Sequence, residues 1–261
     1  MTRIAASFLS GRKQLIGYLT AGDPSPERTL DHVAALERGG VDLIELGVPF
    51  SDPIADGPVI QAAAERALAA GTTLATVLEI ARAIRRRSPI PLLLFTYLNP
   101  VVRYGFTRLA EEARDAGIDG CLLTDLSVEE AGNYVQVMRQ VGLDTIFLAA
   151  PTSSDRRLDL VARYSTGFIY CVSRTGVTGE RDQLADGAAV LIQRLRRRTS
   201  LPLALGFGIA RPDQARQAAT VCDGVVVGSA LVRLIAAGED LEAYARSLRE
   251  SIDRAEASVG H

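Results

Sequence analysis

The sequence is poor in the side chains that most often serve as nucleophiles or metal ligands. It has only two histidines, His32 within a helical pattern and His261 at the last position, which argues against a histidine triad or a histidine metal site. Three cysteines, Cys121, Cys171 and Cys222, lie in or beside apolar runs and lack the paired spacing of metal or redox sites. We therefore expect each cysteine to be a small buried side chain.

Lysine is also scarce, and the chain has no excess of basic over acidic residues. The only lysine, Lys13, precedes the first predicted strand, which argues against Schiff-base catalysis. The net charge of -2 lacks the clustered basic excess that nucleic-acid binding needs. No stretch approaches the roughly 18 apolar residues of a membrane span, and residues 1–14 are too polar for a signal peptide. We expect a soluble, cytoplasmic protein.

What the sequence has instead is a repeated pattern of short apolar runs separated by segments of helical periodicity. The eight runs are at 15–20, 42–46, 91–97, 119–123, 144–149, 167–172, 201–206 and 223–228. Several helical segments end in glycine just before the next run, as in RGGVDLIEL and DAGIDGCLL. The runs are too apolar to have a solvated face, so they predict parallel strands covered by helices.

This pattern predicts the α/β class and a (β/α)8 TIM barrel, formed as a single domain by residues 1–261. Helices at about 2–10, after DGPVIQ, and at about 239–257 would be additions to the basic barrel. An open doubly wound sheet is the alternative if one predicted strand is false. It is disfavoured because no G-x-G-x-x-G motif follows the first strand.

The stretch ELGVPFSDPIADGP, residues 45–58, begins at the end of the second predicted strand, where a barrel places its catalytic groups. Glu45 has apolar neighbours, and poor solvation raises a carboxyl pKa into the range useful for general acid–base catalysis. A buried structural ion pair is the alternative. Asp56 lies on a loop stiffened by three prolines. It is either a second catalytic acid or a turn or N-cap residue ahead of the next helix.

Three glycine-containing loops follow the last three predicted strands: GVTG (176–179), GFGI (206–209) and VGSA (227–230). Glycine lets backbone N–H groups approach an anion, and a helix N-terminus attracts negative charge. Loops after the last two strands of a barrel often bind phosphate, and Ser229 offers a further hydroxyl donor. Each loop alone is also typical of an ordinary turn, but together they predict a phosphate site.

A phosphate site opposite two acids favours proton-transfer chemistry on carbon: isomerisation, aldol cleavage or elimination. Glycosidases also use carboxylate pairs, but they do not need a phosphate cradle built from three loops. From the residues alone, the reaction stays open among these classes.

The motifs also resemble those of one known family. They are YLTAGDP (18–24), ELGVPFSDPIADGPVIQ (45–61), TYLNP (96–100), APTS (150–153), SRTGVTGE (173–180), GFGI and VVVGSA. Their order and positions resemble the tryptophan synthase alpha chain over essentially the whole sequence. The resemblance implies a lyase of tryptophan biosynthesis that cleaves indole-3-glycerol phosphate to indole and D-glyceraldehyde 3-phosphate without a metal or cofactor of its own.

The same resemblance implies a partner and a role for individual residues. The partner is a beta chain that carries pyridoxal phosphate, receives the indole and forms an alpha2beta2 heterotetramer. Glu45 is implied to be the general acid–base, and Asp56 the acid that binds the indole N–H. The implied substrate-binding residues are Tyr18, Tyr170, Thr178, Gly179, Phe207, Gly208, Gly228 and Ser229.

Three segments are further implied to meet the partner or the substrate. Residues 51–54 and 99–104 resemble the loops that contact the beta chain, and residues 173–180 resemble a lid with Thr178 near Asp56. Gly17, Thr124 and Ser127 depart from the family, which commonly has proline there; we expect altered loop stiffness near the first and fourth strands. The alternatives are a stand-alone indole-3-glycerol phosphate lyase, a phosphosugar isomerase-type barrel, or a non-catalytic regulatory barrel.

Overall fold

The computed structural model describes residues 1–172, 186–206 and 208–259. The predicted lid at 173–180, with Thr178 and Gly179, and the predicted pocket residue Phe207 lie outside these ranges.

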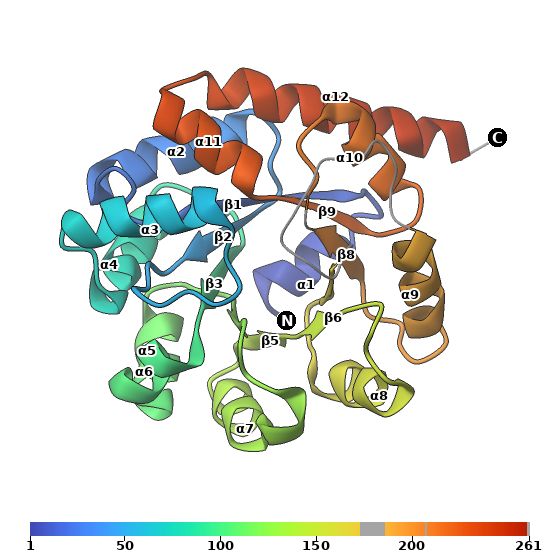
Figure 1. Ribbon diagram of the computed structural model, residues 1–261, viewed down its shortest axis with the longest axis horizontal. Helices are drawn as coiled ribbons and strands as arrows, with labels where there is room; N and C mark the ends of the chain where they lie inside the picture. Colours follow the sequence, from blue (N-terminus) through green and yellow to red (C-terminus); the bar gives the residue numbers. More distant parts are fainter. Residues whose placement is uncertain (173–185, 207, 260–261) are drawn as a thin grey trace.

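The strands form one wholly parallel sheet whose two ends meet (Figure 1). Their bounds are β1 (Gln14–Thr20), β2 (Leu43–Gly47), β3 (Leu92–Thr96), β4 (Gly120–Leu123), β5 (Asp144–Ile146), β6 (Leu148–Ala149), β7 (Ile169–Val172), β8 (Leu203–Gly206) and β9 (Gly224–Val227). The order is β5-β4-β3-β2-β1-β9-β8-β7-β6.

The sheet is a barrel because β5 and β6 are consecutive pieces of one chain segment. β5 pairs with β4, and β6, which follows after Phe147, pairs with β7. The sheet therefore returns to its own starting edge, unlike an open doubly wound sheet. The predicted TIM barrel is confirmed, with the predicted strand at 144–149 divided in two.

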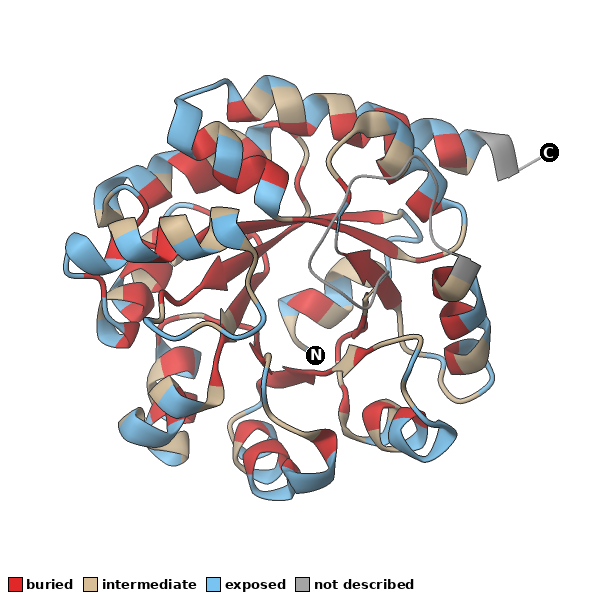
Figure 2. Cartoon of the chain, in the orientation of Figure 1, coloured by how far each residue is buried: buried red, intermediate tan, exposed pale blue. Residues whose placement is uncertain are grey.

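Helices surround the barrel, with exposed outer faces and buried faces toward the strands (Figure 2). Their bounds are α1 (Arg3–Phe8), α2 (Pro26–Arg38), α3 (Pro58–Ala69), α4 (Leu74–Arg85), α5 (Leu98–Tyr104), α6 (Phe106–Asp115), the 3₁₀ turn η1 (Val128–Glu130), α7 (Gly132–Gln140), α8 (Asp155–Tyr164), α9 (Asp186–Arg196), α10 (Pro212–Ala219), α11 (Ser229–Ala237) and α12 (Leu241–Val259). The three predicted additional helices are present as α1, α3 and α12.

No single helix in residues 1–172, 186–206 or 208–259 is both long and apolar enough to span a membrane. Helices α3 and α4 pass that test only as a pair, and the pair is bent by 94°.

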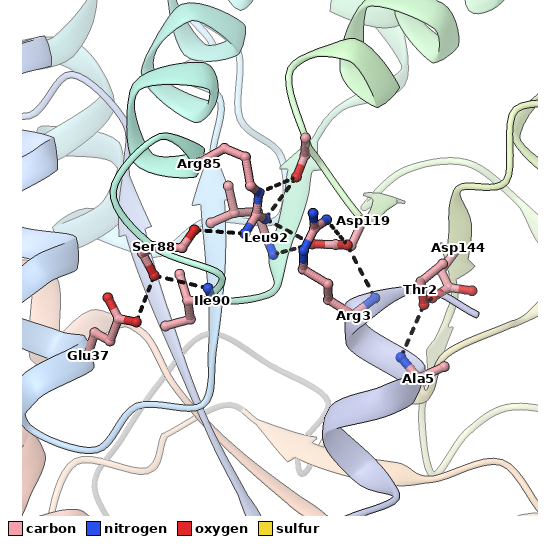
Figure 3. Close-up of polar contacts among 11 residues, drawn as sticks. Thr2, Arg3, Ala5, Glu37, Arg85, Ser88, Ile90, Leu92, Asp119 and Asp144 are labelled. Carbon is pink, nitrogen blue, oxygen red and sulfur yellow. Dashed lines mark hydrogen bonds and ion pairs between the residues drawn. The ribbon is translucent and has the colours of Figure 1, made fainter.

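Helix α1 closes the barrel at the end where the strands begin. Its Ile4 and Phe8 pack against the residues that fill the barrel interior. Figure 3 shows how it is held: Arg3 forms an ion pair of 3.0 Å with Asp119, directly before β4, and Thr2 donates to Asp144, the first residue of β5. The site must therefore open at the opposite end, where the strands finish.

Candidate active site

Glu45 points into the barrel from the third position of β2. It is in register with Tyr18 on β1 and Leu93 on β3. It lies two residues after Leu43, an interior residue, and side chains two apart on a strand point to the same face. It is 1% exposed, and its Oε1 has no hydrogen-bond partner among the described residues. Burial raises the pKa of this carboxyl to about 8. The described part of the chain contains no ion pair to Glu45, so the structural alternative has no support there.

Asp56 lies on the loop between β2 and α3, close to the mouth of the barrel. The N-cap of α3 is Gly57, not Asp56, so the alternative interpretation of Asp56 as a capping residue is wrong. The Asp56 carboxylate instead accepts a hydrogen bond from the Tyr97 hydroxyl. Burial raises the pKa of Asp56, and the Tyr97 hydrogen bond opposes that rise.

Tyr97 is a site residue that the sequence analysis missed. It is 3% exposed and follows β3, and its hydroxyl oxygen also accepts the Ala55 N–H at 3.1 Å. It was visible only as part of the motif TYLNP. An aromatic residue at the end of an apolar strand is usually a core residue, and nothing local to TYLNP indicates Asp56, 41 positions earlier in the chain.

Tyr18 and Tyr170 share the barrel interior with Glu45. Burial, followed by the charges of Asp56 and Glu45, raises the pKa of the Tyr18 phenol above its ordinary value. Burial and the charge of Glu45 raise the pKa of Tyr170. Both phenols therefore stay neutral, and hydroxyl groups are placed around the buried acid.

Two glycines make room for these hydroxyls, a role that no sequence motif indicates. A Cβ on Gly47, the last residue of β2, would lie 2.2 Å from the Tyr18 hydroxyl oxygen. A Cβ on Gly206, the last residue of β8, would lie 2.2 Å from the Tyr170 hydroxyl oxygen. Any larger residue at either position would displace a tyrosine of the site.

Two of the predicted phosphate loops, after β8 and β9, lie at this same end of the barrel, whereas GVTG (176–179) lies outside the described residues. Gly208, two residues past the end of β8, has a φ of +84°, a left-handed conformation that favours glycine, with open space beside it. Gly228 is the N-cap of α11, and a Cβ there would lie 3.5 Å from the Cβ of Tyr18. The positive end of α11, with exposed Ser229 at its first position, thus adjoins the site.

The structure offers no obvious metal centre. Residues 1–172, 186–206 and 208–259 contain no group of three or more histidine, cysteine or acidic side chains placed to hold a metal ion. The groups brought together are two carboxyls, three tyrosine hydroxyls and a helix N-terminus, which suit proton transfer on an anionic substrate.

The model of the family described as "Tryptophan synthase alpha chain" matches residues 4–259. The chain belongs to the tryptophan synthase alpha chain family. The curated tryptophan synthase alpha chain of Solibacter usitatus is 62% identical over 260 residues, covering 95% of this chain and 97% of that protein. The alpha chain of Geotalea uraniireducens is 50% identical over 238 residues, covering 90% and 89% respectively.

Solved structures agree with this assignment. Tryptophan synthase subunit alpha from Legionella pneumophila has a TM-score of 0.89 at 36% identity, covering 97% of this chain and 99% of that one. A chain of Mycobacterium tuberculosis tryptophan synthase has a TM-score of 0.90 at 36% identity, covering 96% and 98%. This alpha chain is a TIM-barrel enzyme of tryptophan synthesis, of the lyase type.

The three departures from the alpha-chain pattern have different surroundings. Gly17 lies within β1 rather than in a loop, and a Cβ there would meet Leu231 and Val41 side chains at 3.3 Å, so the expected effect on loop stiffness is wrong for this position. Thr124 follows β4, and its hydroxyl donates to the Thr96 carbonyl oxygen at 3.3 Å. Ser127 precedes η1 and hydrogen-bonds Glu129.

Proposed function

We propose that this chain cleaves indole-3-glycerol phosphate to indole and D-glyceraldehyde 3-phosphate by carboxylate general acid–base catalysis. The observation that carries the proposal is Glu45, a buried carboxyl with a pKa of about 8 that is directed into the barrel and has an unpartnered oxygen. A carboxyl with that pKa is largely protonated at neutral pH, so it can donate a proton to carbon.

The reaction proceeds in two proton transfers through this one group. Glu45 donates its proton to C3 of the indole ring, and the ring becomes a cation. The Glu45 carboxylate then removes the proton from the side-chain hydroxyl next to C3. The C–C bond breaks as the aldehyde forms, its electron pair returns to the ring, and indole leaves. Glu45 ends the cycle protonated again.

Asp56 stabilises the positive charge that appears on the ring. Its carboxylate would accept the indole N–H and offset the developing charge. The Tyr97 hydrogen bond favours the ionised form of Asp56 that this role needs. Asp56 would act as a carboxylate and Glu45 as a proton donor, because the Tyr97 hydrogen bond opposes the rise in the pKa of Asp56, whereas Oε1 of Glu45 has no partner among the described residues.

The remaining substrate-binding residues hold the two ends of the molecule. Tyr18 and Tyr170 border the reacting carbon, and Phe207 would contact the ring. The phosphate would be held by Gly179, Gly208, Gly228 and Ser229, with Thr178 on a lid at 173–180. The N-terminus of α11 and the open space at Gly208 support the phosphate position.

We further propose a single domain that works in the cytoplasm with a tryptophan synthase beta chain, as an alpha2beta2 complex in which pyridoxal phosphate belongs to the beta chain. The segments at 51–54 and 99–104 carry two exposed apolar side chains, Ile54 at 82% and Val102 at 56%. Exposed apolar groups beside a site mark an interaction surface. The three buried, free cysteines support a reducing compartment.

The test is indole release from indole-3-glycerol phosphate by the wild-type chain, with and without the beta chain. We expect release that the beta chain stimulates, a loss of at least about 10³-fold in Glu45→Gln, and a loss of about 10²-fold or more in Asp56→Asn. No indole from the wild-type chain even with the beta chain would contradict the proposal. Equal rates with and without the beta chain would identify a stand-alone lyase.

A further inference from the structure

Tyr97 lies where Asp56 meets both segments that we assign to the partner surface. Its ring packs against Phe50, with centroids 5.3 Å apart, and Phe50 directly precedes the segment 51–54. Tyr97 is itself the N-cap residue of α5, which contains the segment 99–104. The Tyr97 side chain thus packs beside the beginning of the first segment, and its backbone leads into the helix that contains the second.

The Tyr97 hydroxyl is the polar centre of this arrangement. It accepts the Ala55 N–H at 3.1 Å and donates its only hydrogen to the Asp56 carboxylate. The Thr124 hydroxyl, from the loop after β4, donates to the carbonyl oxygen of Thr96, the residue before Tyr97, at 3.3 Å. Ala55 and Asp56 are neighbours, so one hydroxyl fixes both the backbone of the loop and the carboxylate on it.

Two structural links would pass a displacement at the surface to this hydroxyl. Exposed Val102 is on α5, a short helix whose first N–H, from Leu98, is held by Asp125 at 2.6 Å. Exposed Ile54 is the residue before Ala55. A partner that presses on either side chain acts on an element bonded directly to Tyr97.

We propose that Tyr97 is a positioning residue that couples contact at the segments 51–54 and 99–104 to the orientation of Asp56. This inference rests on the proposed function and adds how the same site is regulated. The partner it implies is a protein with an apolar surface complementary to Ile54 and Val102.

The titratable groups near Asp56 in the described structure are few. Tyr97 hydrogen-bonds its carboxylate, and the phenol of Tyr18 is affected by the charges of both Asp56 and Glu45. Both phenols have a pKa raised by burial above their ordinary value, so neither ionises near neutral pH. A change in Asp56 titration after loss of the Tyr97 hydroxyl therefore reports that hydrogen bond.

The decisive variant is Tyr97→Phe, which removes the hydroxyl and keeps the ring against Phe50. Because the hydrogen bond lowers the pKa of Asp56, its loss is expected to move the Asp56 titration to higher pH, measured by carbon-13 NMR of the carboxyl in the full chain. An Asp56→Asn sample assigns the signal. Stimulation of indole release by saturating beta chain is expected to fall about tenfold, with kcat changing more than KM.

Tyr164→Phe is the matched control. Tyr164 ends α8, and its ring packs against Phe147 near the opposite end of the barrel. We expect it to leave both the Asp56 titration and the stimulation unchanged. Phe50→Leu keeps the hydroxyl and removes the ring contact, and it is expected to reduce the stimulation without moving the Asp56 titration.

Each outcome decides one question. Tyr97→Phe with a wild-type Asp56 titration and wild-type stimulation overturns the coupling. If Tyr97→Phe does not fold, an unchanged stimulation in Phe50→Leu overturns it and a reduced one supports it. A wild-type chain that releases no indole refutes the proposed function, and the NMR titration then still decides whether Tyr97 controls Asp56.

Discussion

Glu45 shows how burial can turn an ordinary carboxyl into a proton donor. Its strand neighbours are apolar, no described group donates to its Oε1, and burial is the cause of its raised pKa. The sequence was sufficient for this inference, because the relevant features are local: a glutamate at the end of an apolar run.

Replacing Glu45 by glutamine is expected to stabilise the protein at alkaline pH. The folded-state pKa of about 8 lies above the ordinary 4.5, so the folded state binds the proton more tightly than the unfolded state. The contribution of Glu45 to the free energy of unfolding is fully present below about pH 4.5 and is lost as the pH rises through about 8. At about pH 9, Glu45→Gln should have a free energy of unfolding up to about 4 kcal/mol higher than wild type.

Urea denaturation at about pH 6 and about pH 9 measures this effect. The stability difference between Glu45→Gln and wild type should grow in favour of the variant with increasing pH. A difference that is the same at both pH values would show that Glu45 ionises as an exposed carboxyl does.

Tyr97, Gly47 and Gly206 show what the sequence could not reveal at the residue scale. Each affects a residue of another strand or loop. Tyr97 hydrogen-bonds Asp56, Gly47 leaves space for the Tyr18 hydroxyl, and Gly206 leaves space for the Tyr170 hydroxyl. A glycine at a strand end is typical of a turn, and its role as space for a hydroxyl exists only after the barrel forms.

Of the helices, α1 agrees with the prediction from sequence, whereas α5 lies in a segment predicted as a loop. α1 was predicted, and the structure adds its role as the plug of the barrel. α5 was not predicted as a helix, because Pro100 interrupts its pattern. Pro100 is the third residue of α5, within the first turn, where a missing N–H breaks no helical hydrogen bond.

The anchoring of α1 depends on Asp119, whose side chain is 3% exposed. It pairs with Arg3 at 3.0 Å and Arg85 at 3.1 Å, and it accepts the Leu92 N–H at 3.0 Å (Figure 3). Asp119→Ala leaves these donors without their acceptor and is expected to cost about 3 kcal/mol of unfolding free energy, with indole release retained in the folded protein.

The control for Asp119 is Asp115→Ala, four residues earlier. Asp115 pairs with Arg114, and both side chains are more than half exposed, at 58% and 51%. Its loss should change the unfolding free energy by less than about 1 kcal/mol. Equal costs for the two substitutions, measured by urea denaturation, would mean that α1 is not anchored through Asp119.

For the whole molecule, the barrel was predictable because its repeat is periodic: eight apolar runs, each followed by a helical segment. The division of the run at 144–149 into β5 and β6 was not, because DTIFLA is uninterrupted in sequence. Phe147 at the break packs outward against Tyr134 and Tyr164, a contact that only the assembled helices α7 and α8 provide.

The barrel isolates one neutral carboxyl, that of Glu45, from water and places Asp56, hydrogen-bonded to Tyr97, at its mouth. The pH dependence of kcat/KM for indole release, with saturating beta chain, tests this most directly. We predict that kcat/KM falls about tenfold per pH unit above about pH 8, as free Glu45 loses its proton. A kcat/KM that stays constant up to about pH 10 would contradict Glu45 as the proton donor.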